Sequence, residues 1–102
     1  MADEITWFTV RLALLGLSPA SGPQAAKNLA DELPFNTYLR NPRVIWESEL
    51  HRIVIQVDTE DTKPGSAANQ VREEMMEILA AVWKDTEGTH YELLGVEPST
   101  DQ

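Results

Sequence analysis

The pattern of apolar and polar residues divides the chain into six segments, four with the period of a strand and two with the period of a helix. Residues 5–14, ITWFTVRLAL, are rich in β-formers, and their alternate positions fall on opposite faces of a strand. Residues 43–48 and 52–58 predict a hairpin, because three consecutive polar residues, 47–49, interrupt a run too long for one ordinary strand. A final strand is expected over residues 89–96.

Two other segments repeat their apolar residues every three or four positions, as a helix with one buried face does. The first follows the loop GLSPASGP and covers residues 24–33. Ser21 and Gln24 have the spacing of a capping box, and Pro23 suits a first helical turn. The second, residues 67–84, carries the longest apolar stripe of the chain: Ala68, Val71, Met75, Ile78, Leu79 and Val82.

The resulting order of strand, helix, strand, strand, helix, strand predicts an α+β domain with the ferredoxin-like split βαβ (βαββαβ) plan. In that plan one four-stranded antiparallel sheet carries both helices on one face. The length predicts a single domain over residues 1–102, with an ordered core over about 4–96 and a flexible acidic tail over 97–102. Because many unrelated functions share this plan, it predicts none by itself.

Helices on one face leave the other face of the sheet open, and the expected strands place apolar residues there. The residues that we assign to this open face as a candidate interface are Ile5, Trp7, Arg11, Val54 and Leu94. A mixed apolar patch is typical of a protein interface, and two-fold dimers are the commonest oligomers. The sequence therefore predicts a non-catalytic interaction module that forms a homodimer through this face or binds another protein. The competing interpretation is that these are scattered surface residues, or that the ends of the chain cover them.

The loops over residues 16–23 and 34–43 suggest an alternative function, a regulatory module that binds a small ligand at one end of the sheet. A candidate anion site accompanies it, made of Tyr38, Arg40, Arg43 and Arg52. The competing interpretation pairs these arginines with Glu47 and Glu49 across the sheet.

The composition narrows the functions that such a surface can serve. Seventeen acidic and eight basic residues give a net charge of -9, which disfavours binding to nucleic acid or to an anionic membrane. The chain contains no cysteine, shows no signal-peptide pattern and has no apolar run long enough to cross a bilayer, so we expect a cytoplasmic protein. His51 and His90 lack metal-ligand spacing, and no nucleophile has a matching base. The sequence therefore predicts no metal, no cofactor and no catalytic residue.

Overall fold

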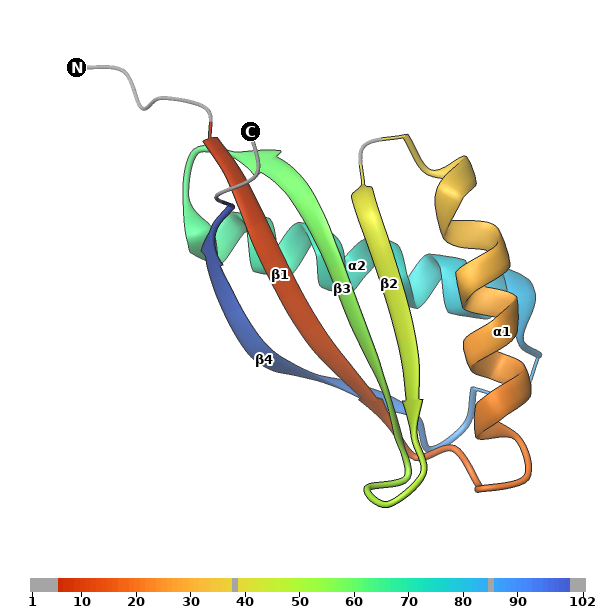
Figure 1. The fold of residues 1–102 in the computed structure, drawn as a ribbon. Coiled ribbons are helices and arrows are strands. Elements are labelled where there is room, and N and C mark those ends of the chain that lie inside the picture. Colours follow the sequence, from red (N-terminus) through yellow and green to blue (C-terminus); the bar gives the residue numbers. More distant parts are fainter. Residues whose placement is uncertain (1–5, 38, 85, 100–102) are drawn as a thin grey trace.

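The computed structural model describes residues 6–37, 39–84 and 86–99, which form four strands and two α-helices (Figure 1). Along the chain they are β1 (Thr6–Leu15), α1 (Gly22–Glu32), β2 (Arg40–Glu47), β3 (Arg52–Asp61), α2 (Pro64–Val82) and β4 (His90–Pro98), with a 3-10 turn at Leu33–Phe35 after α1. All six predicted segments are present. The structure confirms an α+β protein with a four-stranded antiparallel sheet and two helices.

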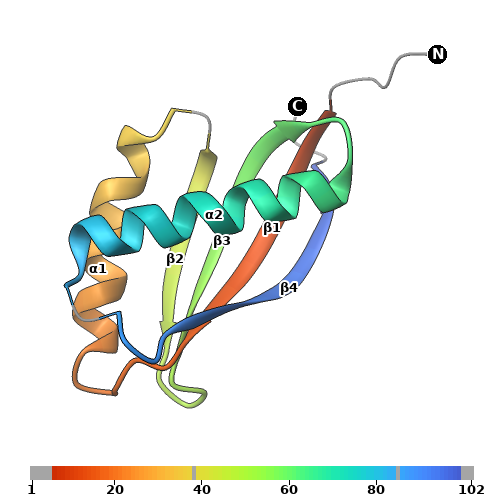
Figure 2. The ribbon, with the colours of Figure 1, turned by 180° about the vertical axis from the view of Figure 1, so that it is seen from behind.

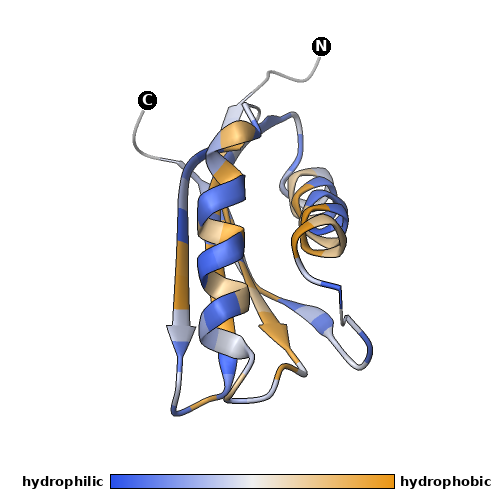
Figure 3. Ribbon diagram, turned by 90° about the vertical axis from the view of Figure 1, so that its right-hand side faces the viewer, coloured by the Kyte–Doolittle hydropathy of each residue, from blue (hydrophilic) through white to orange (hydrophobic). Residues whose placement is uncertain are grey.

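The strands lie in the order β2-β3-β1-β4, so the two central strands are β1 and β3. Val10 of β1 pairs with Val57 of β3 on one side and with Val96 of β4 on the other. Figure 2, from behind, shows α2 crossing the sheet, and Figure 3 shows α1 and α2 on the same side of it. One sheet face is therefore covered by helices, and the other, which we call the open face, is not.

The core lies between the sheet and the helices. Alternate residues of β1 and β3, such as Leu12 and Ile55, are buried there against the apolar stripes of the helices. Leu29 of α1 and Met75 of α2 have no exposed surface. Burial of these stripes, more than helix propensity, holds both helices in place.

The hairpin between β2 and β3 is confirmed, and its turn covers residues 48–51. Glu47 pairs with Arg52 at the last ladder position, and the amide of Leu50 donates to the carbonyl of Glu47. His51 takes the left-handed conformation, with φ of 50°. Since that conformation usually belongs to Gly or Asn, the sequence carries only a weak turn signal here.

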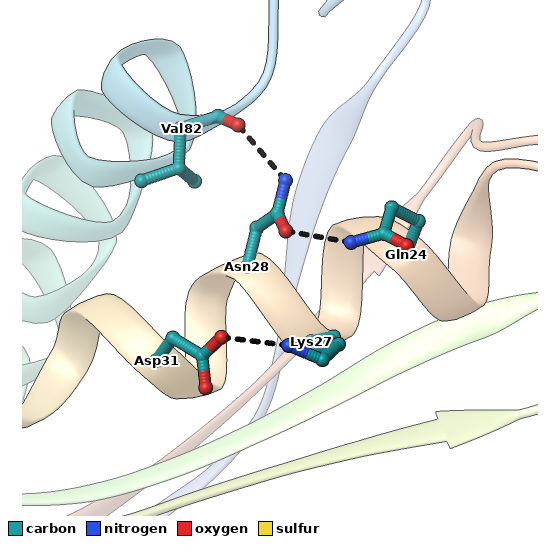
Figure 4. A network of polar contacts seen from close by, with 5 residues as sticks. All are labelled: Gln24, Lys27, Asn28, Asp31 and Val82. Carbon is teal, nitrogen blue, oxygen red and sulfur yellow. Dashed lines mark hydrogen bonds and ion pairs between the residues drawn. The ribbon is translucent and has the colours of Figure 1, made fainter.

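The predicted capping box at the start of α1 is wrong, because the Ser21 side chain makes no capping hydrogen bond. Gln24 instead donates to the side-chain oxygen of Asn28, one turn along the helix, at 2.9 Å (Figure 4). Asn28 in turn donates to the carbonyl oxygen of Val82 at 3.2 Å. That carbonyl belongs to the last turn of α2, where no partner within the helix is available. The polar side of α1 thus caps the end of α2.

Candidate functional site

The open face is built from residues of all four strands, aligned by the strand registers. Ile45 of β2 pairs with Val54 of β3, and Val54 pairs with Ala13 of β1. The Ile45 side chain is 57% exposed, Val54 is half-buried and Ala13 is buried. We call these three residues the apolar row. Leu94 of β4, 40% exposed, lies at the bulge of that edge strand.

A polar row lies next to the apolar row. Arg43 of β2 pairs with Gln56 of β3, which pairs with Arg11 of β1. The polar row borders a hollow of about 580 Å³ that is also lined by Thr9, Asn41, Asp58 and Glu97. The hollow takes residues from all four strands, so it exists only in the assembled sheet.

Asp58 fixes the floor of this hollow by linking three strands. Its carboxylate is nearly buried, and it accepts a hydrogen bond from the Thr9 hydroxyl at 2.7 Å and one from the Asn41 amide at 2.8 Å. Asn41 and Pro42 form a bulge in β2, because Arg40 pairs with Asp58 while Arg43 pairs with Gln56.

Asn41 adopts a left-handed backbone with φ of 52°, which asparagine tolerates better than most residues. Pro42 is compatible with β2 because β2 is an edge strand. The bulge aims the Asn41 side chain at Asp58 and returns β2 to register at Arg43.

The structure distributes the predicted anion-site residues over the length of the hairpin. Arg40 lies over the ring of Trp7, with 4.4 Å between its guanidinium carbon and the ring centroid. Arg52 pairs with Glu47, as the cross-strand interpretation expects. Of the three described arginines of this set, only Arg43 lines the hollow, and Tyr38 lies outside the described residues.

The five candidate interface residues also have different surroundings. Ile5 lies outside the described residues, while Trp7 is half-buried near the start of β1 under Arg40. Arg11 and Leu94 are exposed and Val54 is half-buried. Sequence reasoning did not single out Ile45, whose position on this face follows from its pairing with Val54.

The structure does not bring together the two loops of the alternative ligand site, residues 16–23 and 34–43. The loop over residues 16–21 precedes α1, and the described residues Asn36, Thr37 and Leu39 follow α1 and the 3-10 turn. Figure 1 shows them at opposite ends of that helix, so they cannot form one site at one end of the sheet.

Within the described ranges, no cluster of three or more histidine or carboxylate side chains is placed to hold a metal ion. No described helix combines the length and apolar character that spanning a membrane requires.

No family model matches the chain, and no curated protein matches it. A solved structure that is similar is that of the uncharacterized protein TM1266 from Thermotoga maritima, with 12% identity and a TM-score of 0.40. The match covers 93% of this chain and 98% of that one. A likeness this distant does not indicate a function.

Proposed function

We propose that this protein is a non-catalytic self-association module with the ferredoxin-like plan, and that two copies pack through their open sheet faces. The strand order and the common side of the two helices support the plan. A second copy covers the face that the helices leave open, as in two sheets packed face to face about 10 Å apart.

The apolar row carries this proposal. Single exposed apolar residues are ordinary on protein surfaces. Ile45 and Val54 are instead neighbours on adjacent strands, beside the buried Ala13 of β1. On β4, Glu92 pairs with Ala13, and the exposed Leu94 lies at the bulge further along. Burial of such a patch contributes about 25 cal/mol for each Å² of apolar surface removed from water.

The distribution of charge also favours contact at this face over contact elsewhere. Two copies with a net charge of -9 each repel one another. Four of the eight basic residues lie on the sheet strands, and they are Arg11, Arg40, Arg43 and Arg52. Acidic residues such as Glu47, Glu92 and Glu97 lie on the same strands. In a two-fold dimer each face meets its own copy, so Arg40 or Arg52 of one copy can pair with acids of the other.

The test is the mass in solution of the wild type and of Ile45→Glu, measured by light scattering after size exclusion. We expect a wild-type mass of twice the 11.4 kDa chain and a folded monomer for the variant. An unpaired carboxylate in an apolar contact costs about 2–4 kcal/mol, which raises the dissociation constant at least about 30-fold.

Leu50→Glu is the matched control, because Leu50 is 58% exposed in the hairpin turn, outside the open face. This variant should remain a dimer. A monomeric wild type from micromolar to millimolar concentration would refute the proposal, and so would dissociation by Leu50→Glu as large as that by Ile45→Glu. Circular dichroism of each variant verifies that it is folded.

A further inference from the structure

The hollow beside the polar row differs from the apolar row in its chemistry. We infer that it binds a small organic anion, whose carboxylate or phosphate group is held between Arg11 and Arg43. This inference concerns the single chain, in which the hollow is open to solvent, and it does not rest on the proposed dimer.

The strand registers bring the two arginines within reach of one group. Arg43 and Arg11 pair with the same residue, Gln56, from its two sides. Neighbouring strands are about 4.8 Å apart, so the two arginine backbones are separated by about 10 Å. Both side chains are long enough to meet above Gln56, and guanidinium groups match the oxygen pairs of carboxylate and phosphate.

Both guanidinium groups are available to a ligand. Arg43 makes no ion pair with any residue in the described ranges. Arg11 reaches Glu97 only at 4.0 Å, and 54% and 68% of the two side chains are exposed, so water screens this contact. The other acid in the hollow, Asp58, already accepts hydrogen bonds from Thr9 and Asn41.

The setting of the arginines favours a small ligand over a polyanion. The hollow is an open, mostly polar depression of about 580 Å³, which has room for a small anion but not for a long polymer. The overall charge of -9 opposes a long anionic polymer, which would extend beyond the hollow onto acidic surface. The strands and the Asp58 hydrogen bonds hold the floor of the hollow and the backbones of both arginines in place before the ligand arrives, which lowers part of the entropic cost of binding.

The experiment is an NMR titration of the ¹⁵N-labelled full chain with sodium phosphate and, separately, with sodium succinate, each against sodium chloride at matched ionic strength. We expect saturable shifts at the backbone amides of Arg11, Arg43 and Gln56 with at least one of the two anions. The anion that produces them identifies the group as phosphate or carboxylate. Arg43→Gln and Arg11→Gln should each weaken binding at least about tenfold, because each removes a charge-assisted donor.

Arg72→Gln is the matched control, because Arg72 is exposed on α2, away from the hollow, and its loss changes the net charge equally. It should bind like the wild type. Absence of saturable shifts with both anions would overturn the inference, and so would equal binding by Arg43→Gln and the wild type. The titration is repeated on Ile45→Glu, a substitution outside the hollow, so that failure of anion binding can be distinguished from failure of dimer formation. Retained binding there supports a single-chain site, and lost binding in a folded variant overturns it.

Discussion

Replacing Asp58 by alanine tests whether the hydrogen bonds beneath the hollow hold the open face together. The substitution removes the acceptor for the Thr9 hydroxyl and for the Asn41 amide, and so cuts links from β3 to β1 and to β2. The two partners lie 49 and 17 residues from Asp58 along the chain.

The expected loss follows from the number of bonds and from the burial of the acid. A hydrogen bond to a charged group contributes about 1.5–3 kcal/mol, so two contribute about 3–6 kcal/mol. Removing the carboxylate also relieves the cost of keeping a charge that is only 7% exposed in the folded protein. We therefore expect a net loss of about 2–4 kcal/mol, equivalent to a fall in Tm of about 10–20 °C for a domain of this size.

The assay is urea unfolding followed by circular dichroism, with the midpoint and slope fitted for each variant. Glu60→Ala is the control, since Glu60 is an exposed acid two residues further along β3. It should lose less than about 0.5 kcal/mol. Equal losses for Asp58→Ala and Glu60→Ala would refute the reasoning, because water would then replace both hydrogen bonds at no cost.

Asn41 supplies a second, independent check of the same linkage. Asn41→Gly keeps the left-handed backbone and removes one bond to Asp58, so we expect a loss of about 1–2 kcal/mol. Asn41→Ala should lose about 1 kcal/mol more, because a Cβ is strained at this φ. In combination with Asp58→Ala, the loss at Asn41 should shrink, since the shared bond is already gone.

Two further predictions concern the helix-covered side. Gly22→Ala should lower the free energy of unfolding by about 1–3 kcal/mol, because the added Cβ would meet the ring of Trp46. The control is Gly65→Ala, where the added Cβ has nothing within 4 Å, so its free energy of unfolding should be unchanged or slightly higher. Urea unfolding measures both. Tyr91 donates its hydroxyl proton to the carbonyl of Met75 at 3.1 Å, and burial raises the pKa of this hydroxyl. The protonated Tyr91 hydroxyl therefore contributes fully to the folding stability below the unfolded-state pKa of about 10, and this contribution is lost as the pH rises above that value. Tyr91→Phe should make the fall in urea midpoint between pH 8 and pH 11 shallower, and an unchanged slope would contradict this assignment.

Patterns within single segments predicted most of the architecture. The interruption at residues 47–49 identified the hairpin, and the structure begins its turn at residue 48. The apolar stripe over residues 67–84 identified α2. These signals succeed because the side-chain period of a strand or helix is a property of neighbouring residues, which the chain carries before it folds.

Features that depend on contacts between segments escaped prediction. Strict alternation in the last strand puts Leu94 and Val96 on one face, but a bulge between Leu93 and Gly95 leaves Leu94 as the extra residue. Val96 consequently pairs with Val10 and packs against the core. The capping box is absent because Ser21 makes no capping hydrogen bond and Gln24 bonds to Asn28 within α1. The bond from Asn28 to the end of α2 depends on how the two helices pack.

The sequence by itself determined which segments are strands and helices, which of their faces is apolar, and that the surface is acidic. Only the tertiary structure decided that Ile45, Val54 and Ala13 share a row, and that Arg43 and Arg11 flank one hollow while Arg40 and Arg52 do not. The physical reason is register. A shift of one residue between strands turns every side chain to the other face, and that choice is fixed by packing between segments far apart in the chain.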